Sequence, residues 1–264
     1  MTPTFPKLTL YRADGSCALV PHMILRELGI PFTDVVMDFS PTTGLLQSVD
    51  GTLDFAAYQK IHPSGLVPAL RIVENSSGND DDDAEEGKSI VLTENPAIQM
   101  YIASLVPSSP IAGSTLLQRA QVLSWLNFLS GSVHGQGYGA LWRPGRYIDV
   151  QSFPGSKEAV EAAGRRSIEK YYNMIETRLK DDAGAGGVRY ALDDDRGGGD
   201  EHQQPTLVDF YLYLFFRWGN KIGIDAMKER FPNFTGIARA VEARESVKVV
   251  LAEEKAAFQF ASSA

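Results

Sequence analysis

The chain of 264 residues has a single cysteine, Cys17, and no long apolar run. One cysteine excludes an intramolecular disulfide and suits a reducing compartment, and the four histidines show no zinc-ligand spacing. No apolar run approaches the ~20 residues that a membrane helix needs, and the N-terminus lacks the apolar core of a signal peptide. We therefore expect a cytoplasmic protein that has no metal site and does not associate with membranes.

The chain also has no excess of positive charge: its net charge is −8, and its lysines and arginines form no basic stripe. This argues against nucleic acid as a partner. The sequence contains no Walker A motif, no Gly-x-Gly-x-x-Gly and no Gly-x-Ser-x-Gly. Nucleotide chemistry and serine-hydrolase chemistry of these types are thereby excluded.

Cys17 stands where a predicted strand gives way to a predicted helix. The strand begins near residue 7, Asp14 and Gly15 indicate a turn, and apolar residues then recur at helical spacing until Gly29, a plausible helix stop. Free N–H groups and the helix dipole favour a thiolate there, whether it belongs to Cys17 or to a ligand. The alternative that stays open at this point is that Cys17 is only a small buried residue.

A second feature is Pro68, which precedes an apolar run, residues 69–73, that is predicted to be a strand. Proline cannot donate to a sheet ladder and is tolerated at the first residue of a strand or at an edge. If the Val67–Pro68 bond is cis, the backbone N–H and C=O of Val67 become available to a peptide-like ligand.

A third feature lies in residues 91–103, where a predicted strand ends in Thr93-Glu94-Asn95 and Pro96 opens a helix. Asn95 is a candidate N-cap, and Pro96 is compatible with the first helical turn. The N–H groups of this helix can bind a carboxylate, while the preceding Glu94 can bind an amino group. Capping alone explains Asn95 and Pro96, but it does not explain the acid before them.

These three features, in this order, resemble the thioredoxin-like half of a cytosolic glutathione transferase, most similar to the beta class. The second half matches too: Ser124–Leu129 followed by His134 resembles a beta-class segment, and Leu207–Tyr213 with the following Phe216-Arg217-Trp218 resembles a helix start of the family. The resemblance implies an α/β thioredoxin-like N-terminal domain, 1–106, and an all-α C-terminal domain, 114–264. The linker is expected at 107–113.

The resemblance also implies roles for individual residues. Val67, before Pro68, would pair with the cysteinyl backbone of glutathione, and Glu94 with Asn95 would hold its γ-glutamyl end. From the helical half, Asn127 and His134 would lie near the sulfur. The cysteine matched by Cys17 faces the glutathione thiol in the family and can form a mixed disulfide with it. Because other classes of the family use a serine on this turn, Ser16 is a rival to Cys17 as the main thiolate donor. A homodimer is expected as well.

The second substrate is expected to be a small apolar electrophile bound by aromatic side chains, of which Tyr138, Trp142 and Trp218 are the candidates. The predicted function is a glutathione-dependent transferase, with thiol exchange through Cys17 as a further reaction. Two alternatives are a glutathione-dependent isomerase or lyase, and a protein of this fold that binds a ligand or partner without catalysis. The non-catalytic alternative is favoured by two departures from the beta class. Residues 38–41 lack the lysine that usually contacts glutathione, and Gly135 replaces a second lysine, which usually follows the histidine matched by His134.

The remaining pattern predicts helices at about 55–60, from 115 onward, at 156–179, at 225–230 and at 235–257. Thr206 with Asp209 forms a capping-box variant that we interpret as structural. Two polar stretches, 75–89 and 181–204, are predicted to be long loops, and 135–156 is expected to be irregular.

Overall fold

The computed structural model describes residues 5–74, 89–149, 151–181, 190–192 and 204–260. The chain forms two compact units. The first unit consists of Met1–Ser109 and Arg244–Phe258, and the second consists of Pro110–Ala243 and Gln259–Ala264. The sequence-based division into 1–106 and 114–264 stays a proposal. The segment Arg244–Phe258, which that division assigns to the helical half, groups here with the first unit.

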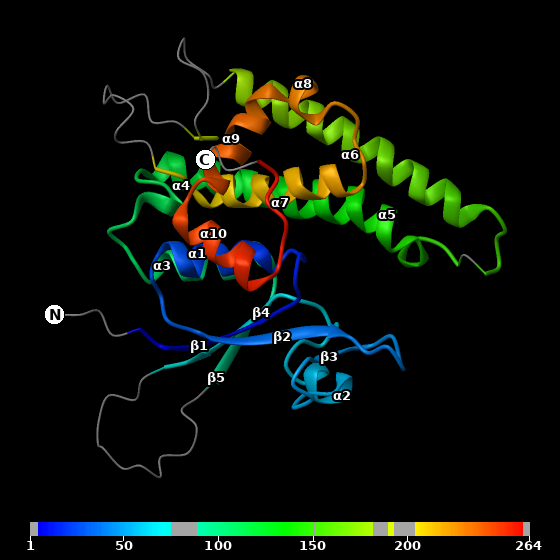
Figure 1. The fold of residues 1–264 in the computed structure, drawn as a ribbon, viewed down its shortest axis with the longest axis horizontal. Coiled ribbons are helices and arrows are strands. Elements are labelled where there is room, and N and C mark those ends of the chain that lie inside the picture. The colour runs from blue at the N-terminus through cyan, green and yellow to red at the C-terminus, as the bar shows by residue number, and fades with distance from the viewer. Residues whose placement is uncertain (1–4, 75–88, 150, 182–189, 193–203, 261–264) are drawn as a thin grey trace. The chain divides into compact units, whose positions relative to one another are not determined.

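The first unit is built on a five-stranded mixed sheet with the order β3-β2-β1-β4-β5 (Figure 1). β1 and β2 are parallel, which requires a crossover, and the helix α1 (Leu19–Glu27) provides it. The other neighbouring pairs are antiparallel. The strands are β1 (Lys7–Arg12), β2 (Thr33–Phe39), β3 (Leu46–Ser48), β4 (Ala69–Val73) and β5 (Ser89–Leu92).

Helices cover both faces of this sheet. α1, α3 (Asn95–Ser104) and α10 (Glu245–Glu253) lie over one face, and α2 (Phe55–Gln59) lies over the other (Figure 1). Because side chains alternate along a strand, β1 supplies Leu8 and Leu10 to one face and Tyr11 to the other.

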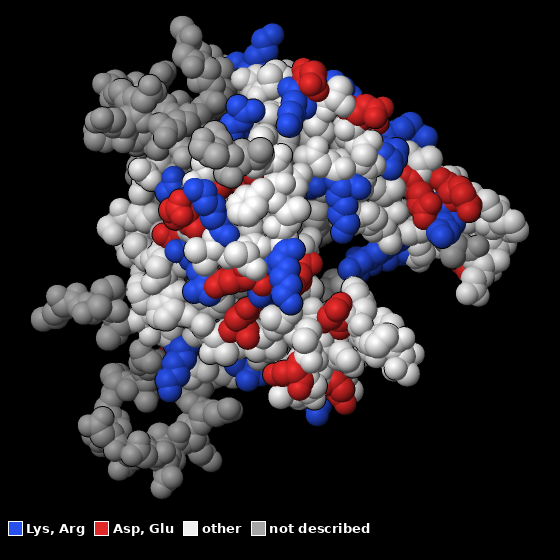
Figure 2. Space-filling view, in the orientation of Figure 1, with Lys and Arg blue, Asp and Glu red and all other residues white. Residues whose placement is uncertain are grey.

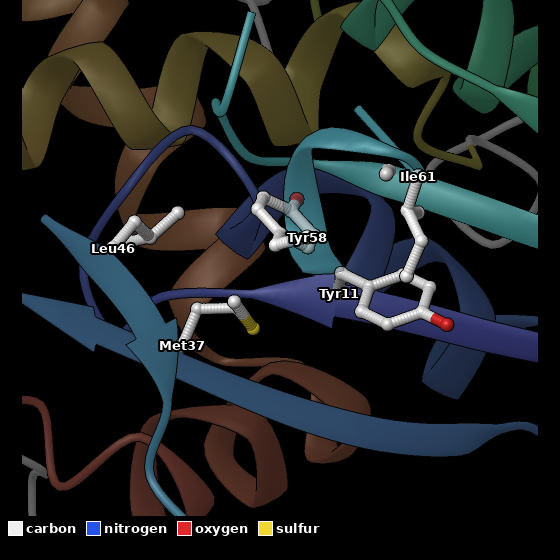
Figure 3. Packing of buried hydrophobic residues seen from close by; sticks show 6 residues of the cluster. Tyr11, Met37, Leu46, Tyr58 and Ile61 are labelled. Atoms are coloured by element: carbon white, nitrogen blue, oxygen red, sulfur yellow. The ribbon is translucent and has the colours of Figure 1, made fainter. Parts of the chain in front are cut away.

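The core under α2 is a small cluster of buried side chains. Tyr58 of α2 packs against Tyr11 with ring centroids 5.7 Å apart, and Met37 and Leu46 extend the cluster along β2 and β3 (Figure 3). Tyr11 is 4% exposed, so it belongs to the core. This cluster holds β1 and the segment after α2 together beside the turn that follows β1.

In its described residues the second unit is entirely helical. A buried helix, α7 (Leu207–Lys221), runs through it, and the side chains of all its first ten residues are fully buried. The predicted box at its start is confirmed, because Thr206 and Asp209 cap each other. The helices are α4 (Leu116–Asn127), a π-helix (Phe128–Tyr138), α5 (Gly139–Trp142), α6 (Ser156–Asp181), α7 (Leu207–Lys221), α8 (Met227–Arg230) and α9 (Pro232–Glu242).

The structure corrects three sequence-based expectations. Asn95 is not the N-cap of α3; Glu94 precedes the helix, and Asn95 is its first residue. The expected helix at 235–257 is two helices, because Arg244 is extended (φ −71°, ψ 137°) between α9 and α10. Much of the expected irregular stretch is ordered, since the π-helix runs to Tyr138 and continues into α5.

Other expectations agree with the structure. Gly29 follows α1 with φ +64°, which is the left-handed conformation that ends a helix. The short helix α2, the strand β4 and the long helix α6 occupy the expected positions. Most of the two predicted loops, 75–89 and 181–204, lies outside the described residues.

Lysine and arginine side chains alternate with aspartate and glutamate over the face in Figure 2, without a broad region of one sign in its described part. Among the described residues, no helix combines the length and the apolar character that a membrane crossing requires. The same residues contain no group of three or more potential metal ligands.

Candidate active site

A tight turn after β1 carries Ser16 and Cys17. It closes by a hydrogen bond from the Ser16 N–H to the Ala13 carbonyl (3.1 Å), and Gly15 has a φ of +66° that suits glycine. The Ser16 hydroxyl accepts the Ala18 N–H at 3.1 Å, so it already satisfies one free donor at the start of α1. Ser16 is half-buried and Cys17 is buried.

The Cys17 side chain faces the segment before β4. Its Sγ donates to the Val67 carbonyl at 3.4 Å, a contact that requires the protonated thiol. The Val67–Pro68 bond is cis. Tyr58 anchors the same segment, because its hydroxyl donates to the Leu66 carbonyl at 2.7 Å. The first two sequence features, 50 residues apart, therefore meet in space.

Asn95 connects the third feature to the first. Its Nδ2 donates to the Cys17 carbonyl at 2.7 Å, and its Oδ1 accepts from Nε2 of Gln99 at 2.9 Å. Asn95 and Gln99 are both buried. A hydrogen-bonded pair thus ties the first turn of α3 to the backbone of the cysteine.

Glu94 has an unusual backbone conformation. Its φ is +66° and its ψ is 115°, outside the regions that a residue with a Cβ normally adopts. Such strain costs on the order of 1–3 kcal/mol and tends to occur at functional sites. The Glu94 side chain is exposed at the N-terminus of α3, where no side chain caps the helix.

His62 lies near Glu94 and was not singled out from the sequence. Burial lowers the pKa of His62 below its usual range, while the Glu94 carboxylate acts in the opposite direction. The ring is 6% exposed, and its Nδ1 has no hydrogen-bond partner among the described residues. A lone histidine in an Ile-His-Pro stretch carries no spacing signal, so the sequence alone could not have assigned it to this site.

The cysteine turn also contacts the end of α10. Glu254 accepts the Gly15 N–H at 2.8 Å, and its other oxygen lies 2.9 Å from Nδ1 of His22 on α1. These residues are separated by more than 230 positions in the sequence. No local pattern could have indicated their contact.

In the helical unit, His134 belongs to an aromatic cluster. Its ring lies 5.2 Å from Trp218, and Trp218 in turn lies 4.7 Å from Trp142 and 5.0 Å from Tyr138. Burial, assisted by the positive charges of Arg143 and Arg146, lowers the pKa of His134 to about 4. The imidazole is therefore neutral at pH 7 and can act as an acceptor or a single donor.

The members of this cluster differ in exposure. Trp142 is 42% exposed, whereas Trp218 and Tyr138 are buried. The Tyr138 hydroxyl lies 2.7 Å from that of Tyr172, which places its polar end inside the unit. Trp142 is therefore the member with the most surface to offer to a ligand.

Asn127 is in the same helical unit, but its hydrogen bond is to α4 and not to this aromatic cluster. Its side chain is exposed and donates to the Leu123 carbonyl one turn earlier in α4, at 2.9 Å. This bond within the helix leaves the Asn127 Oδ1 available.

The geometry of the first unit suits a peptide-like thiol. A backbone carbonyl, a helix N-terminus with an acid beside it, and a turn that carries a hydroxyl and a thiol meet around Cys17. A strand-like backbone can pair with the carbonyl, a carboxylate with the helix N–H groups, and an ammonium group with Glu94.

Comparisons with known proteins found relatives in sequence and in fold. No protein-family model matches the sequence. The chain is 25% identical over 219 residues to glutathione S-transferase GstA of Escherichia coli O157:H7, covering 83% of the chain and 85% of the relative.

Solved structures show the same fold over nearly the whole chain. A sphingomonad glutathione S-transferase complexed with glutathione is 27% identical, with a TM-score of 0.66 and coverage of 94% of this chain and 100% of the other. The beta-class glutathione S-transferase of Sphingomonas chungbukensis is 26% identical, with a TM-score of 0.64 and coverage of 93% and 98%. The predicted thioredoxin-like domain with an all-helical partner is thereby confirmed.

Proposed function

The chain belongs to the glutathione transferase family, and from this premise we propose that it joins glutathione to a small apolar electrophile, with thiol exchange through Cys17 as a second reaction. The observation that carries the proposal is the meeting of three segments at Cys17. The Val67 carbonyl lies 3.4 Å from its Sγ, and the Asn95 amide lies 2.7 Å from its backbone oxygen. The sphingomonad relative was solved in complex with glutathione.

Glutathione offers a thiol, two carboxylates and one ammonium group, and residues of the first unit match the thiol, the γ-glutamyl carboxylate and the ammonium group. Val67 pairs with the cysteinyl backbone of the tripeptide through its N–H and C=O. The N–H groups at the start of α3, beside Asn95, donate to the γ-glutamyl carboxylate, and the Glu94 carboxylate accepts from the adjacent ammonium. The positive φ of Glu94 supports this role, because strain is retained where a side chain must point at a ligand.

The turn stabilises the thiolate. The start of α1 provides the positive end of a helix dipole, and Ser16 provides an O–H donor. The Cys17 S–H, which donates to the Val67 carbonyl in the structure, turns to the glutathione sulfur when the peptide binds. Each unit by which the glutathione thiol pKa falls requires about 1.4 kcal/mol of preferential thiolate stabilisation. One charge-assisted hydrogen bond supplies an amount of this order. Attack of this sulfur on the electrophile forms a C–S bond, and the leaving group departs with its electron pair.

The helical unit supplies the acceptor side. Trp142 presents an exposed ring backed by Trp218, and such a platform suits a flat apolar molecule. Neutral His134, held against Trp218, donates or accepts one hydrogen bond without bringing a charge, and Asn127 offers an amide. The resemblance of their segment to the beta class is what supports proposing both residues as contacts of the glutathione sulfur.

A titration with glutathione followed by ultraviolet absorption of the thiolate tests the function. We expect a thiolate signal at pH 7 that rises with added glutathione and saturates at a level set by the protein concentration. S-methylglutathione, which has no thiol, serves as the control. Binding of S-methylglutathione with no thiolate signal from glutathione would favour the non-catalytic alternative. Absence of binding by either peptide would refute the proposal.

We further propose that the protein acts as a homodimer in the cytoplasm. Support comes from large apolar side chains on α4, where Leu116 and Leu117 are 85% and 69% exposed. Light scattering at micromolar concentration should give about twice the chain mass of 28.9 kDa. A monomer that still binds glutathione would contradict the dimer and leave the activity untouched.

A further inference from the structure

A buried carboxylate from the far end of the chain reaches the cysteine turn. Glu254, which directly follows α10, is 3% exposed. One of its oxygens accepts the Gly15 backbone N–H at 2.8 Å, inside the turn and two residues before Cys17. The other lies 2.9 Å from Nδ1 of His22 and 3.7 Å from a guanidinium nitrogen of Arg12.

These contacts place one side chain against three consecutive elements. Arg12 is the last residue of β1, Gly15 lies in the turn, and His22 lies in the first half of α1. Arg12 is buried and fixed in turn by Asp34 of β2, with an Nε–Oδ1 distance of 2.8 Å. The turn that carries Ser16 and Cys17 is therefore held at both ends and in the middle.

The arrangement is costly as a source of stability alone. A buried ion pair gains little over a well-packed apolar pair, because two charges must be removed from water. The carboxylate instead fixes geometry. Its oxygens accept hydrogen bonds from donors at defined positions, and this fixes the backbone between Arg12 and His22. This favours a role in geometry.

α10 is attached independently of Glu254. At its start, Arg244 pairs with Glu27 of α1, with Nε–O distances of 3.0 Å. Near its end, Glu253 pairs with Arg26 and lies 2.9 Å from Nε2 of His22. Substitutions at these two positions therefore weaken the same docking without removing the contact to Gly15.

We propose that Glu254 is a positioning residue of the active site, and that its contact with the Gly15 N–H sets where Ser16 and Cys17 stand. The inference deepens the proposed function, because this turn is the one assigned to the glutathione thiolate. Its first test needs no glutathione, so it can fail or succeed separately from that function.

The test uses Cys17, the single thiol of the chain, as its own reporter. Alkylation by iodoacetamide is followed by mass spectrometry from pH 6 to pH 9 in wild type, Glu254→Gln, Glu253→Gln and Arg244→Gln. We expect Glu254→Gln to react about tenfold faster at each pH, because a neutral amide oxygen holds the Gly15 N–H more weakly than a carboxylate does and the turn then opens more often. The two controls should stay within about twofold of wild type. In the conjugation assay, the KM for glutathione should rise about fivefold in Glu254→Gln only.

Two results would overturn the proposal. One is an unchanged rate in folded Glu254→Gln. The other is the same increase in Arg244→Gln at an equal loss of thermal midpoint, which would assign the effect to loosened α10 docking.

If Glu254→Gln does not fold, hydrogen exchange in the wild-type protein tests the proposal. Its Gly15 amide should exchange with deuterium at least about a hundredfold more slowly than an unstructured peptide. Exchange at the peptide rate would equally refute the proposal.

Discussion

The side-chain amide of Asn95 donates to the backbone carbonyl of Cys17 at 2.7 Å, across 78 positions of sequence. A small residue is usual at this position in the beta class that the sequence resembles. A small side chain would leave the carbonyl without this donor, whereas Asn95 fills the space and is itself held by Gln99. The departure from the family pattern is therefore accommodated by a hydrogen bond that attaches α3 to the cysteine turn.

Replacement of Asn95 by alanine should destabilise the protein. It removes the donor to the Cys17 carbonyl and the acceptor of Gln99, and both groups lie in a buried region. The free energy of unfolding should fall by about 1–3 kcal/mol, measured by urea denaturation. Asn173→Ala is the matched control, because Asn173 is exposed and only donates to the Glu169 carbonyl within α6; it should cost less than ~0.5 kcal/mol. Equal losses in both variants would contradict the structural role of Asn95.

Glu94 should contribute binding energy rather than stability. A charge-assisted hydrogen bond to the glutathione ammonium is worth on the order of 1.5–3 kcal/mol. Glu94→Ala should weaken glutathione binding by roughly ten- to hundredfold, and Glu94→Gln should do nearly as much damage because it keeps the shape and loses the charge. Calorimetric titration measures both, with Glu74→Gln, an exposed acid at the end of β4, as the control. Unchanged affinity in Glu94→Gln would mean that the ammonium is held elsewhere.

The strained backbone at residue 94 allows a comparison between two small replacements. Glu94→Gly and Glu94→Ala both lack the carboxylate and should bind glutathione equally weakly. Only glycine adopts a φ of +66° without steric cost, so Glu94→Gly should be the more stable variant by about 1 kcal/mol in urea denaturation. Elsewhere in a folded chain glycine normally lowers stability relative to alanine. A glycine variant less stable than the alanine variant would therefore show that residue 94 relaxes once its side chain is lost.

The sequence predicted the parts of the site that depend on local signals. Gly15 marked the turn, Pro68 marked the start of β4, and Pro96 marked the first turn of α3. Each is a backbone preference that is visible within a few residues. The contact of Glu254 with Gly15 depends instead on tertiary packing across 239 positions, for which no periodicity exists. Asn95 was misread as a cap because asparagine favours that position, and a buried carbonyl took its side chain instead.

Stability at acidic pH should depend on His134. Its pKa of about 4 in the folded protein lies below the unfolded value of 6.5, so between these values the unfolded chain binds a proton that the folded chain does not. Stability is therefore lost as the pH falls from about 6.5 toward about 4. From pH 7 to pH 5, wild type should lose about 2 kcal/mol more than His134→Asn. Asp209, whose pKa is raised to about 6 by burial, acts with the opposite sign but equally in both proteins. Parallel urea denaturation at the two pH values checks the difference, and identical losses would mean that His134 titrates normally.

Cys17 should form a mixed disulfide with glutathione when the folded protein meets oxidised glutathione. The Cys17 thiolate attacks one sulfur of the oxidised peptide, the peptide's S–S bond breaks, a bond to Cys17 forms, and one glutathione leaves as its thiolate. The thiol is 7% exposed and donates to the Val67 carbonyl, so the reaction should be slower than in the urea-unfolded chain. Mass spectrometry should show one added glutathionyl group, which dithiothreitol removes. Cys17→Ala should show none, since the chain has no other cysteine. An adduct in the unfolded chain but none in the folded one would identify Cys17 as a packing residue and would leave conjugation, supported by Ser16, as the reaction of the site.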